Sequence, residues 1–159
     1  MIRPAKREDC NAIYSLLMEL AEYEHLRDTV TATEADICEA LFGKKPVAES
    51  LIAYRGEEAV GVAVFYTTFS TFVGWPGMYL EDIYVKPEIR GKGIGKAFLN
   101  QLARIARQRN YGRMEWAVLN WNKPAIDFYK SIGAEPLEEW TTYRMFGESI
   151  DRLAEGAEK

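Results

Sequence analysis

The feature that most constrains the fold is a glycine-rich loop between a predicted strand and a predicted helix. Residues 78–85 form an apolar run that is typical of a strand. The loop Arg90-Gly91-Lys92-Gly93-Ile94-Gly95 follows, and a helix is predicted from Lys96 to Arg109. Glycines let the backbone approach a ligand closely, and the first amides of a helix attract an anion. The segment therefore favours phosphate binding, although a turn that only opens the helix fits the glycines equally well.

Two familiar phosphate loops do not fit this segment. The dinucleotide motif requires a third glycine where this chain has Lys96. The P-loop requires glycine where this chain has Arg90, and serine or threonine where it has Ala97. A different kind of phosphate site is therefore expected.

The order of predicted elements indicates an α/β fold with one mixed sheet flanked by helices. Strands are predicted over residues 2–4, 47–54, 59–69, 78–85, 113–119 and 140–145. Besides the helix after the glycine loop, helices are predicted after the capping residues Asp9, Thr33 and Asn122. We expect one domain over residues 1–147 and a polar tail over 148–159.

Charge and cysteine content restrict the partners and the compartment. The net charge of −4 makes nucleic acid a poor partner and favours a small cation. The longest apolar run, residues 59–66, is less than half of the roughly 20 residues that span a bilayer, so no membrane partner is expected. Cys10 and Cys38 form no disulfide framework and no signal peptide precedes them, so we expect reduced thiols in a cytoplasm. The single histidine, His25, argues against a metal site.

Two adjacent carboxylates lie in the predicted strand before the glycine loop. In a regular strand, Glu81 shares one face with Ile83 and Val85, while Asp82 points to the other face. Apolar neighbours remove water from a carboxylate and raise its pKa toward that of a useful base. A charged rim on an exposed strand is the simpler alternative for both residues.

The spacing Arg-x-x-Gly-x-Gly over residues 90–95 resembles the acetyl-CoA loop of the GCN5-related N-acetyltransferases (GNAT). A second block agrees, namely residues 119–125, Leu-Asn-Trp-Asn-Lys-Pro-Ala, followed by Phe128-Tyr129-Lys130. Residues 79–85 and 19–24 are similar to the central strand and first helix of the diamine (spermidine/spermine) and thialysine acetyltransferases. The resemblance implies the GNAT fold and covers nearly the whole chain.

The resemblance also implies roles for individual residues in direct acetyl transfer from acetyl-CoA to an amine. Cofactor-binding residues would come from the central strand, the glycine loop and the second block: Ile83, Tyr84, Val85, Arg90, Gly91, Lys92, Gly93, Ile94, Gly95, Lys96, Asn122, Lys123, Pro124 and Ala125. Tyr129 would be the general acid, although its helical position alone suggests a core tyrosine. Glu81 would lie where the amine arrives and Asp82 would attract its charge, while Tyr23 and Glu24 would contact the amine chain.

The implied acceptor is a small di- or polyamine or a lysine-like amine such as thialysine. Residues 70–77 carry no carboxylate, which is closer to the thialysine group than to the diamine enzymes. An acetyltransferase of a peptide amine or an amino-sugar drug is an alternative, as is a non-catalytic acetyl-CoA sensor. The family commonly forms homodimers, and we expect a homodimer here.

Overall fold

The computed structural model describes residues 1–156 and divides into two compact units. The first unit spans Met1–Leu119, and the second begins at Asn120. A single domain over residues 1–147 stays a prediction, and the last three residues of the predicted tail lie outside the described residues.

The first unit is built on a five-stranded sheet in the order β1-β2-β3-β4-β5. The strands are β1 (Ile2–Pro4), β2 (Glu49–Arg55), β3 (Glu58–Ser70), β4 (Trp75–Val85) and β5 (Met114–Trp116). Neighbouring strands are antiparallel except β4 and β5, which are parallel. The expected mixed sheet is confirmed.

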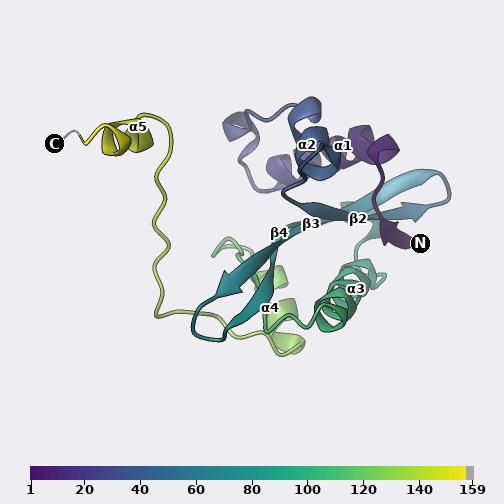
Figure 1. Ribbon diagram of the computed structural model, residues 1–159. Helices are drawn as coiled ribbons and strands as arrows, with labels where there is room; N and C mark the ends of the chain where they lie inside the picture. The colour runs from purple at the N-terminus through teal and green to yellow at the C-terminus, as the bar shows by residue number, and fades with distance from the viewer. Residues whose placement is uncertain (157–159) are drawn as a thin grey trace. The chain divides into compact units, whose positions relative to one another are not determined.

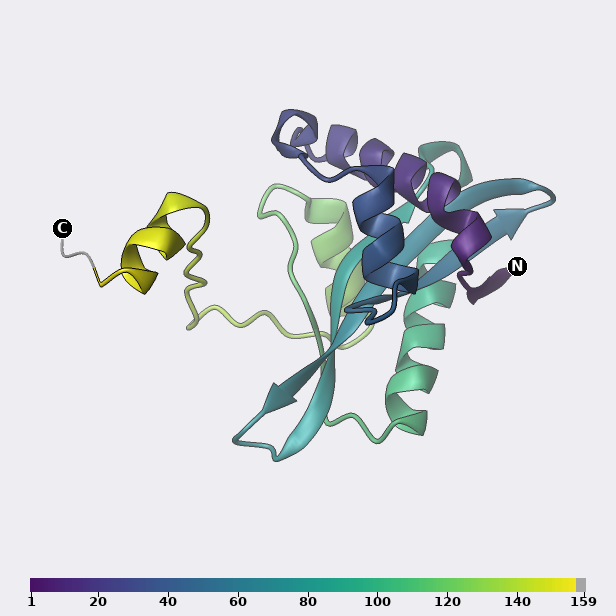
Figure 2. The same ribbon diagram turned by 45° about the horizontal axis from the view of Figure 1, so that its top comes forward.

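Helices cover both faces of this sheet. They are α1 (Cys10–Tyr23), α2 (Glu34–Phe42) and α3 (Ile94–Gln108), with the short 3-10 helices η1 (Arg7–Asp9), η2 (Arg27–Thr29) and η3 (Pro87–Ile89). Figure 1 shows α1 and α2 on one face and α3 on the other. Figure 2 shows the end of the β3–β4 hairpin reaching past the helices. None of the helices within residues 1–156 has the length and apolarity needed to cross a membrane.

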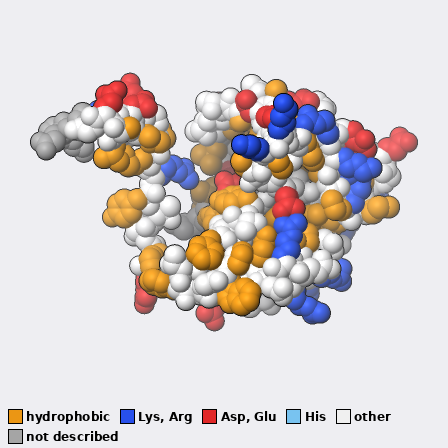
Figure 3. All heavy atoms as spheres, in the orientation of Figure 1, with side chains coloured by type: hydrophobic (Ala, Val, Ile, Leu, Met, Phe, Trp, Pro, Cys, Tyr) orange, Lys and Arg blue, Asp and Glu red, His pale blue; other side chains and the backbone are white. Residues whose placement is uncertain are grey.

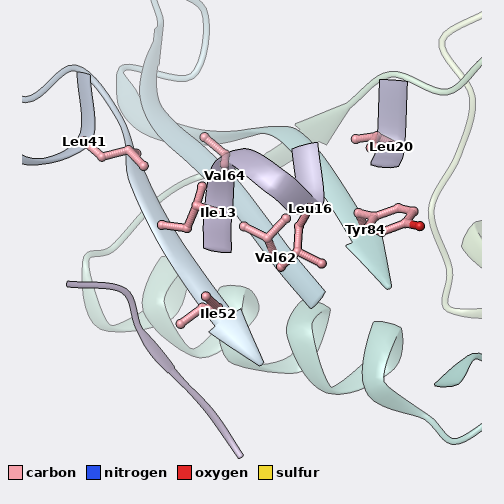
Figure 4. Close-up of a cluster of buried hydrophobic side chains, with 8 residues drawn as sticks. All are labelled: Ile13, Leu16, Leu20, Leu41, Ile52, Val62, Val64 and Tyr84. Carbon is pink, nitrogen blue, oxygen red and sulfur yellow. The ribbon is translucent and has the colours of Figure 1, made fainter. Parts of the chain in front are cut away.

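The core beneath α1 is formed by apolar residues that recur at helical spacing in its sequence. Ile13, Leu16 and Leu20 point from α1 toward the sheet, where Val62 and Tyr84 meet them (Figure 4). All of these side chains are buried. Burial of aliphatic side chains contributes roughly 1.5–3 kcal/mol each, so this face anchors α1 on strands β3 and β4.

Asp9 has a role that differs from the predicted cap of α1. Its side chain accepts no cap hydrogen bond from α1. It accepts two bonds from the Arg3 guanidinium at 2.7 and 2.8 Å, one from the Tyr54 hydroxyl at 2.9 Å and one from the Lys6 amide at 2.7 Å. The bond from Arg3 is the main reason that the pKa of this carboxyl falls to about 2. Asp9 therefore ties β1 and β2 to the start of α1.

The expectation of two reduced thiols is wrong, because Cys10 and Cys38 form a disulfide. Packing of α1 against α2 brings their Cα atoms to 5.4 Å, within the usual range for a disulfide. The two cysteines are 28 residues apart, and this contact between helices left no local motif in the sequence.

Two strand predictions near the end of the first unit need correction. The Trp75-Pro76-Gly77 segment, which lies outside the strands predicted over residues 59–69 and 78–85, belongs to β4, because the ladder with β3 extends to the pair Ser70–Trp75. The strand predicted over residues 113–119 shrinks to the three residues of β5. Long ladder pairing thus outweighs the local signal of a Pro-Gly dipeptide.

The second unit contains α4 (Lys123–Ser131) and α5 (Glu148–Ala154), the latter in the segment predicted as a polar tail. The strand predicted over residues 140–145 does not form. A strand needs a neighbour for its backbone groups, and no ladder within the described residues includes this segment. Its large side chains are exposed, with Trp140 at 75% and Tyr143 at 91%.

Candidate active site

The glycine loop has the conformation expected of a site for a close ligand. Gly91 and Gly93 have positive φ angles of 76° and 81°, which glycine adopts without strain. A Cβ atom added at either position would meet nothing within 4 Å. The space in front of the loop is therefore open to a ligand, and a side chain there would occupy it.

The helix after the loop begins two residues earlier than predicted, at Ile94, so Gly95 and Lys96 lie in its first turn. The Ala97 amide donates to the Gly93 carbonyl at 2.9 Å, which starts the helical ladder. The amides of residues 94–96 precede that ladder and can donate to an anion. Lys92 and Lys96 are exposed beside them. These donors and charges fit a diphosphate.

Strand β4 carries a bulge at Glu81. Leu80 lies opposite Phe65 and Asp82 lies opposite Val64, so Glu81 is an extra residue in the ladder. The regular alternation expected for Glu81 and Asp82 is therefore wrong. Glu81 is exposed and Asp82 is half-buried. Bulges re-aim side chains next to active sites, and this one turns two consecutive carboxylates to the same region.

Three carboxylates act on one another at this bulge. The pKa of Asp82 rises to about 6, first because of burial and then because of the negative charges of Glu81 and Glu24. Burial also raises the pKa of Glu24. Periodicity pointed to Glu81 as the carboxylate with less water around it, but Asp82 is the more buried one. The structure thus brings together three predicted site residues in a cluster suited to a cation.

Two tyrosines beside Glu81 were missed by sequence reasoning. Tyr66 of β3 lies opposite Tyr79 of β4, and their rings stack with centroids 5.4 Å apart. The pKa of Tyr66 is raised by burial and, next, by the Glu81 carboxylate. The register of the β3–β4 hairpin would have revealed this pair, but it could not be read from either strand alone.

Arg90, Tyr23 and Tyr84 form a second group. The Arg90 guanidinium carbon lies 4.4 Å from the centre of the Tyr23 ring and 5.6 Å from that of Tyr84. The Tyr84 hydroxyl donates to the Glu19 carboxylate at 3.1 Å. Burial and Glu19 raise the pKa of Tyr84 to about 12. The side chain of Tyr84 thus belongs to the core, which leaves its main chain, with that of Ile83 and Val85, for the predicted cofactor contact (Figure 4).

The remaining predicted site residues lie in the second unit. The Asn122 side-chain oxygen accepts from the Ala125 amide at 3.4 Å, which confirms the predicted cap, and Pro124 occupies the first turn of α4. The Lys123 ammonium pairs with Asp127 at 2.9 Å. Tyr129 is half-buried on α4, with its ring 5.7 Å from that of Phe128. The roles of these residues in catalysis and cofactor binding stay predictions.

Known proteins have similar sequences over most of the chain. Residues 10–134 match the acetyltransferase (GNAT) family. Thialysine N-epsilon-acetyltransferase from Bos taurus is 41% identical over 97% of this chain and 96% of its own. The protein of that name from Caenorhabditis elegans is 36% identical over 90% of this chain and 89% of its own. A human spermidine/spermine N(1)-acetyltransferase-like protein is 35% identical over 96% of this chain, but over only 23% of its own length.

Solved structures agree on the fold. An integron cassette protein from V. cholerae superposes with a TM-score of 0.81 at 30% identity, covering 97% of this chain and 96% of its own. A ribosomal-protein-alanine N-acetyltransferase from Brucella melitensis has a TM-score of 0.73 at 24% identity, covering 92% of this chain and 99% of its own. At this identity it supports the fold alone. With the matched family region and the near full-length relatives, these likenesses show that the chain belongs to the GNAT family of acetyltransferases.

Proposed function

We propose that this acetyltransferase moves acetyl from acetyl-CoA to the side-chain amine of thialysine or a similar lysine-like small molecule. The carboxylate cluster of Glu24, Glu81 and Asp82 at the β4 bulge is the observation that carries the proposal. It supplies negative charge where a cationic amine would bind. The near full-length relatives that are named for thialysine support the same acceptor.

The glycine loop and its neighbours would hold the cosubstrate. The open backbone of residues 90–96 would bind the diphosphate, and the main chain of residues 83–85 would pair with the pantetheine arm. Residues 122–125, at the start of α4, would line the other side of the cofactor. When bound, acetyl-CoA supplies the thioester whose carbonyl carbon the amine attacks.

Glu81 and Asp82 would prepare the amine. A primary amine has a pKa near 10.4, so only about one molecule in a thousand is neutral at pH 7. Asp82 and Glu24 would attract the ammonium form, and Glu81 would take its proton so that the nitrogen can form the new C–N bond. Binding of the cation would in turn lower the pKa of Asp82, because the positive charge offsets the repulsion among the three carboxylates.

Tyr129 would complete the transfer. As the C–S bond breaks, its phenol would donate a proton to the coenzyme A thiolate, and the second proton that the acylated nitrogen loses would restore the phenol. A phenol, with a pKa near 10, is a weaker acid than a thiol, with a pKa near 8.5, but the gap is small enough for a positioned phenol to make this donation as the thiolate departs.

A panel of amines tests the acceptor. Thiol release from acetyl-CoA would be followed with thialysine, lysine, putrescine, spermidine and a lysine-containing peptide. We expect the highest kcat/KM with thialysine. Reaction with the peptide alone would contradict the proposal, and so would release of thiol with none of the amines.

A polyamine is the second candidate acceptor. Its several cations would suit three neighbouring carboxylates, and the human relative named for spermidine and spermine supports it. The absence of a carboxylate from residues 70–77 weighs against it. A higher kcat/KM for spermidine than for thialysine would favour the polyamine.

We also propose a cytoplasmic homodimer with no nucleic-acid or membrane partner. Large apolar side chains of the second unit, Trp140, Tyr143 and Phe146, are 75–91% exposed and suit a subunit contact. Basic and acidic side chains are interspersed on the face in Figure 3, unlike the continuous basic patch of a nucleic-acid-binding surface. Light scattering at working concentration would give a dimer mass, and a monomer mass would contradict the dimer.

A further inference from the structure

Arg90 joins the cofactor loop to the other elements of the first unit. Its main-chain amide donates to the Pro87 carbonyl at 3.1 Å, which keeps its backbone in the turn that leads to the loop. Its Nε donates to the Val85 carbonyl at 2.9 Å, at the end of β4. From there the guanidinium lies over the Tyr23 ring at 4.4 Å. One side chain therefore links the loop, the central strand and the end of α1.

The tyrosine that Arg90 contacts belongs to the amine side of the proposed site. Tyr23 is the last residue of α1, and Glu24, whose charge acts on Asp82, follows it. The Tyr84 ring is buried and its hydroxyl is bonded to Glu19, so the second ring beside Arg90 is fixed. The guanidinium is thus held between a fixed ring and the ring next to the carboxylate cluster.

We propose that Arg90 is a positioning residue that couples the two substrate sites through its contact with Tyr23. The inference rests on the proposed function, because it takes the loop as the diphosphate site. A diphosphate on the loop would hold the guanidinium over the Tyr23 ring, and the ring would hold the guanidinium ready for the diphosphate. By linkage, whatever a bound amine adds to coenzyme A binding, bound coenzyme A adds to amine binding.

The size of the coupling follows from the geometry. A guanidinium within about 6 Å of a tyrosine ring at an exposed site changes a binding constant by about two- to five-fold. Arg90 is exposed, so this range applies. Lysine at position 90 would keep a charge for the diphosphate but lose the planar group that stacks on the ring.

Isothermal titration of coenzyme A into five variants tests the coupling. Tyr23→Leu should weaken coenzyme A binding two- to five-fold, although the ring lies on the amine side. The same change should add no further loss in an Arg90→Lys background. Tyr23→Phe keeps the ring and should bind as the parent does. Tyr14→Leu, at a half-buried tyrosine in the first half of α1, is the matched control and should also bind normally.

Two results would overturn the inference. One is unchanged affinity in Tyr23→Leu, and the other is an equal loss in both backgrounds. No binding to the parent protein would instead remove the proposed function together with this inference. If Tyr23→Leu fails to fold, Arg90→Lys alone decides the question. At saturating acetyl-CoA it should raise KM for thialysine more than it lowers kcat, and an unchanged KM would refute the coupling.

Discussion

Replacing Asp82 with asparagine should make the protein without substrate more stable and weaken its binding of amines. The pKa of Asp82 rises from its ordinary 3.8 to about 6, mainly through burial and then through Glu81 and Glu24. The folded state therefore binds the proton more tightly than the unfolded state. Stability falls as pH rises from about 4 to about 6 and stays low above that range.

The magnitude follows from these two pKa values. A tenfold change in an acid constant corresponds to about 1.4 kcal/mol, so the change from 3.8 to about 6 is worth about 3 kcal/mol. Asparagine removes the charge and keeps the shape. Asp82→Asn should therefore raise the free energy of unfolding by up to about 3 kcal/mol at pH 7.5 and by almost nothing at pH 4.

Urea unfolding at the two pH values measures this difference. Asp28→Asn, at an exposed aspartate in η2, is the matched control and should change stability little at either pH. In the same preparation, KM for thialysine should rise in Asp82→Asn, because one of the three carboxylates is gone. Equal or lower stability of Asp82→Asn at pH 7.5 would refute the argument that this charge is buried among like charges.

Three further changes are predicted. Cys38→Ser should lower the free energy of unfolding by about 3.5 kcal/mol, since the disulfide to Cys10 spans 28 residues; a mass spectrum showing two free thiols in unreduced protein would contradict it. Because the pKa of Asp9 is lowered to about 2, the free energy of unfolding should fall by about 2.5 kcal/mol as this carboxylate takes up a proton below pH 4. Arg3→Met should reduce this loss of stability at low pH, as measured by urea titrations. Tyr129→Phe should lower kcat about 100-fold with coenzyme A affinity nearly kept, and unchanged turnover at neutral pH would remove Tyr129 from the mechanism.

Local patterns in the sequence were sufficient for helices α1 to α4 and for the caps at Thr33 and Asn122. Ile13, Leu16 and Leu20 recur at the spacing of one helix face, and they form the buried face of α1. Thr33 is the predicted cap of α2, and Asp36 makes this cap reciprocal, with the Thr33 amide donating to Asp36 at 2.8 Å. Because such features depend on residues three or four positions apart, they can be predicted directly from the sequence.

Features that depend on distant partners could not be read in the same way. The bulge at Glu81 exists only relative to β3, and the Cys10–Cys38 disulfide depends on how two helices pack. The segment 140–145 has the composition of a strand, but the ladders of the described residues do not include it. For the candidate site, family resemblance named Glu81 and Asp82, yet only the register showed which of the two carboxylates is the more buried.

Coenzyme A binding to the glycine loop is the claim on which the proposed function depends, and two matched glycine variants test it most directly. Gly93 and Gly56 both have positive φ angles, of 81° and 61°, and both have open space around an added Cβ. Alanine strains the backbone similarly at each position, but only at Gly93 does it fill the space in front of the loop. Calorimetric titration should show coenzyme A binding to the parent protein and to Gly56→Ala, with a loss of at least tenfold in Gly93→Ala. Absence of heat with well-folded parent protein, or equal affinity of the two variants, would contradict the account.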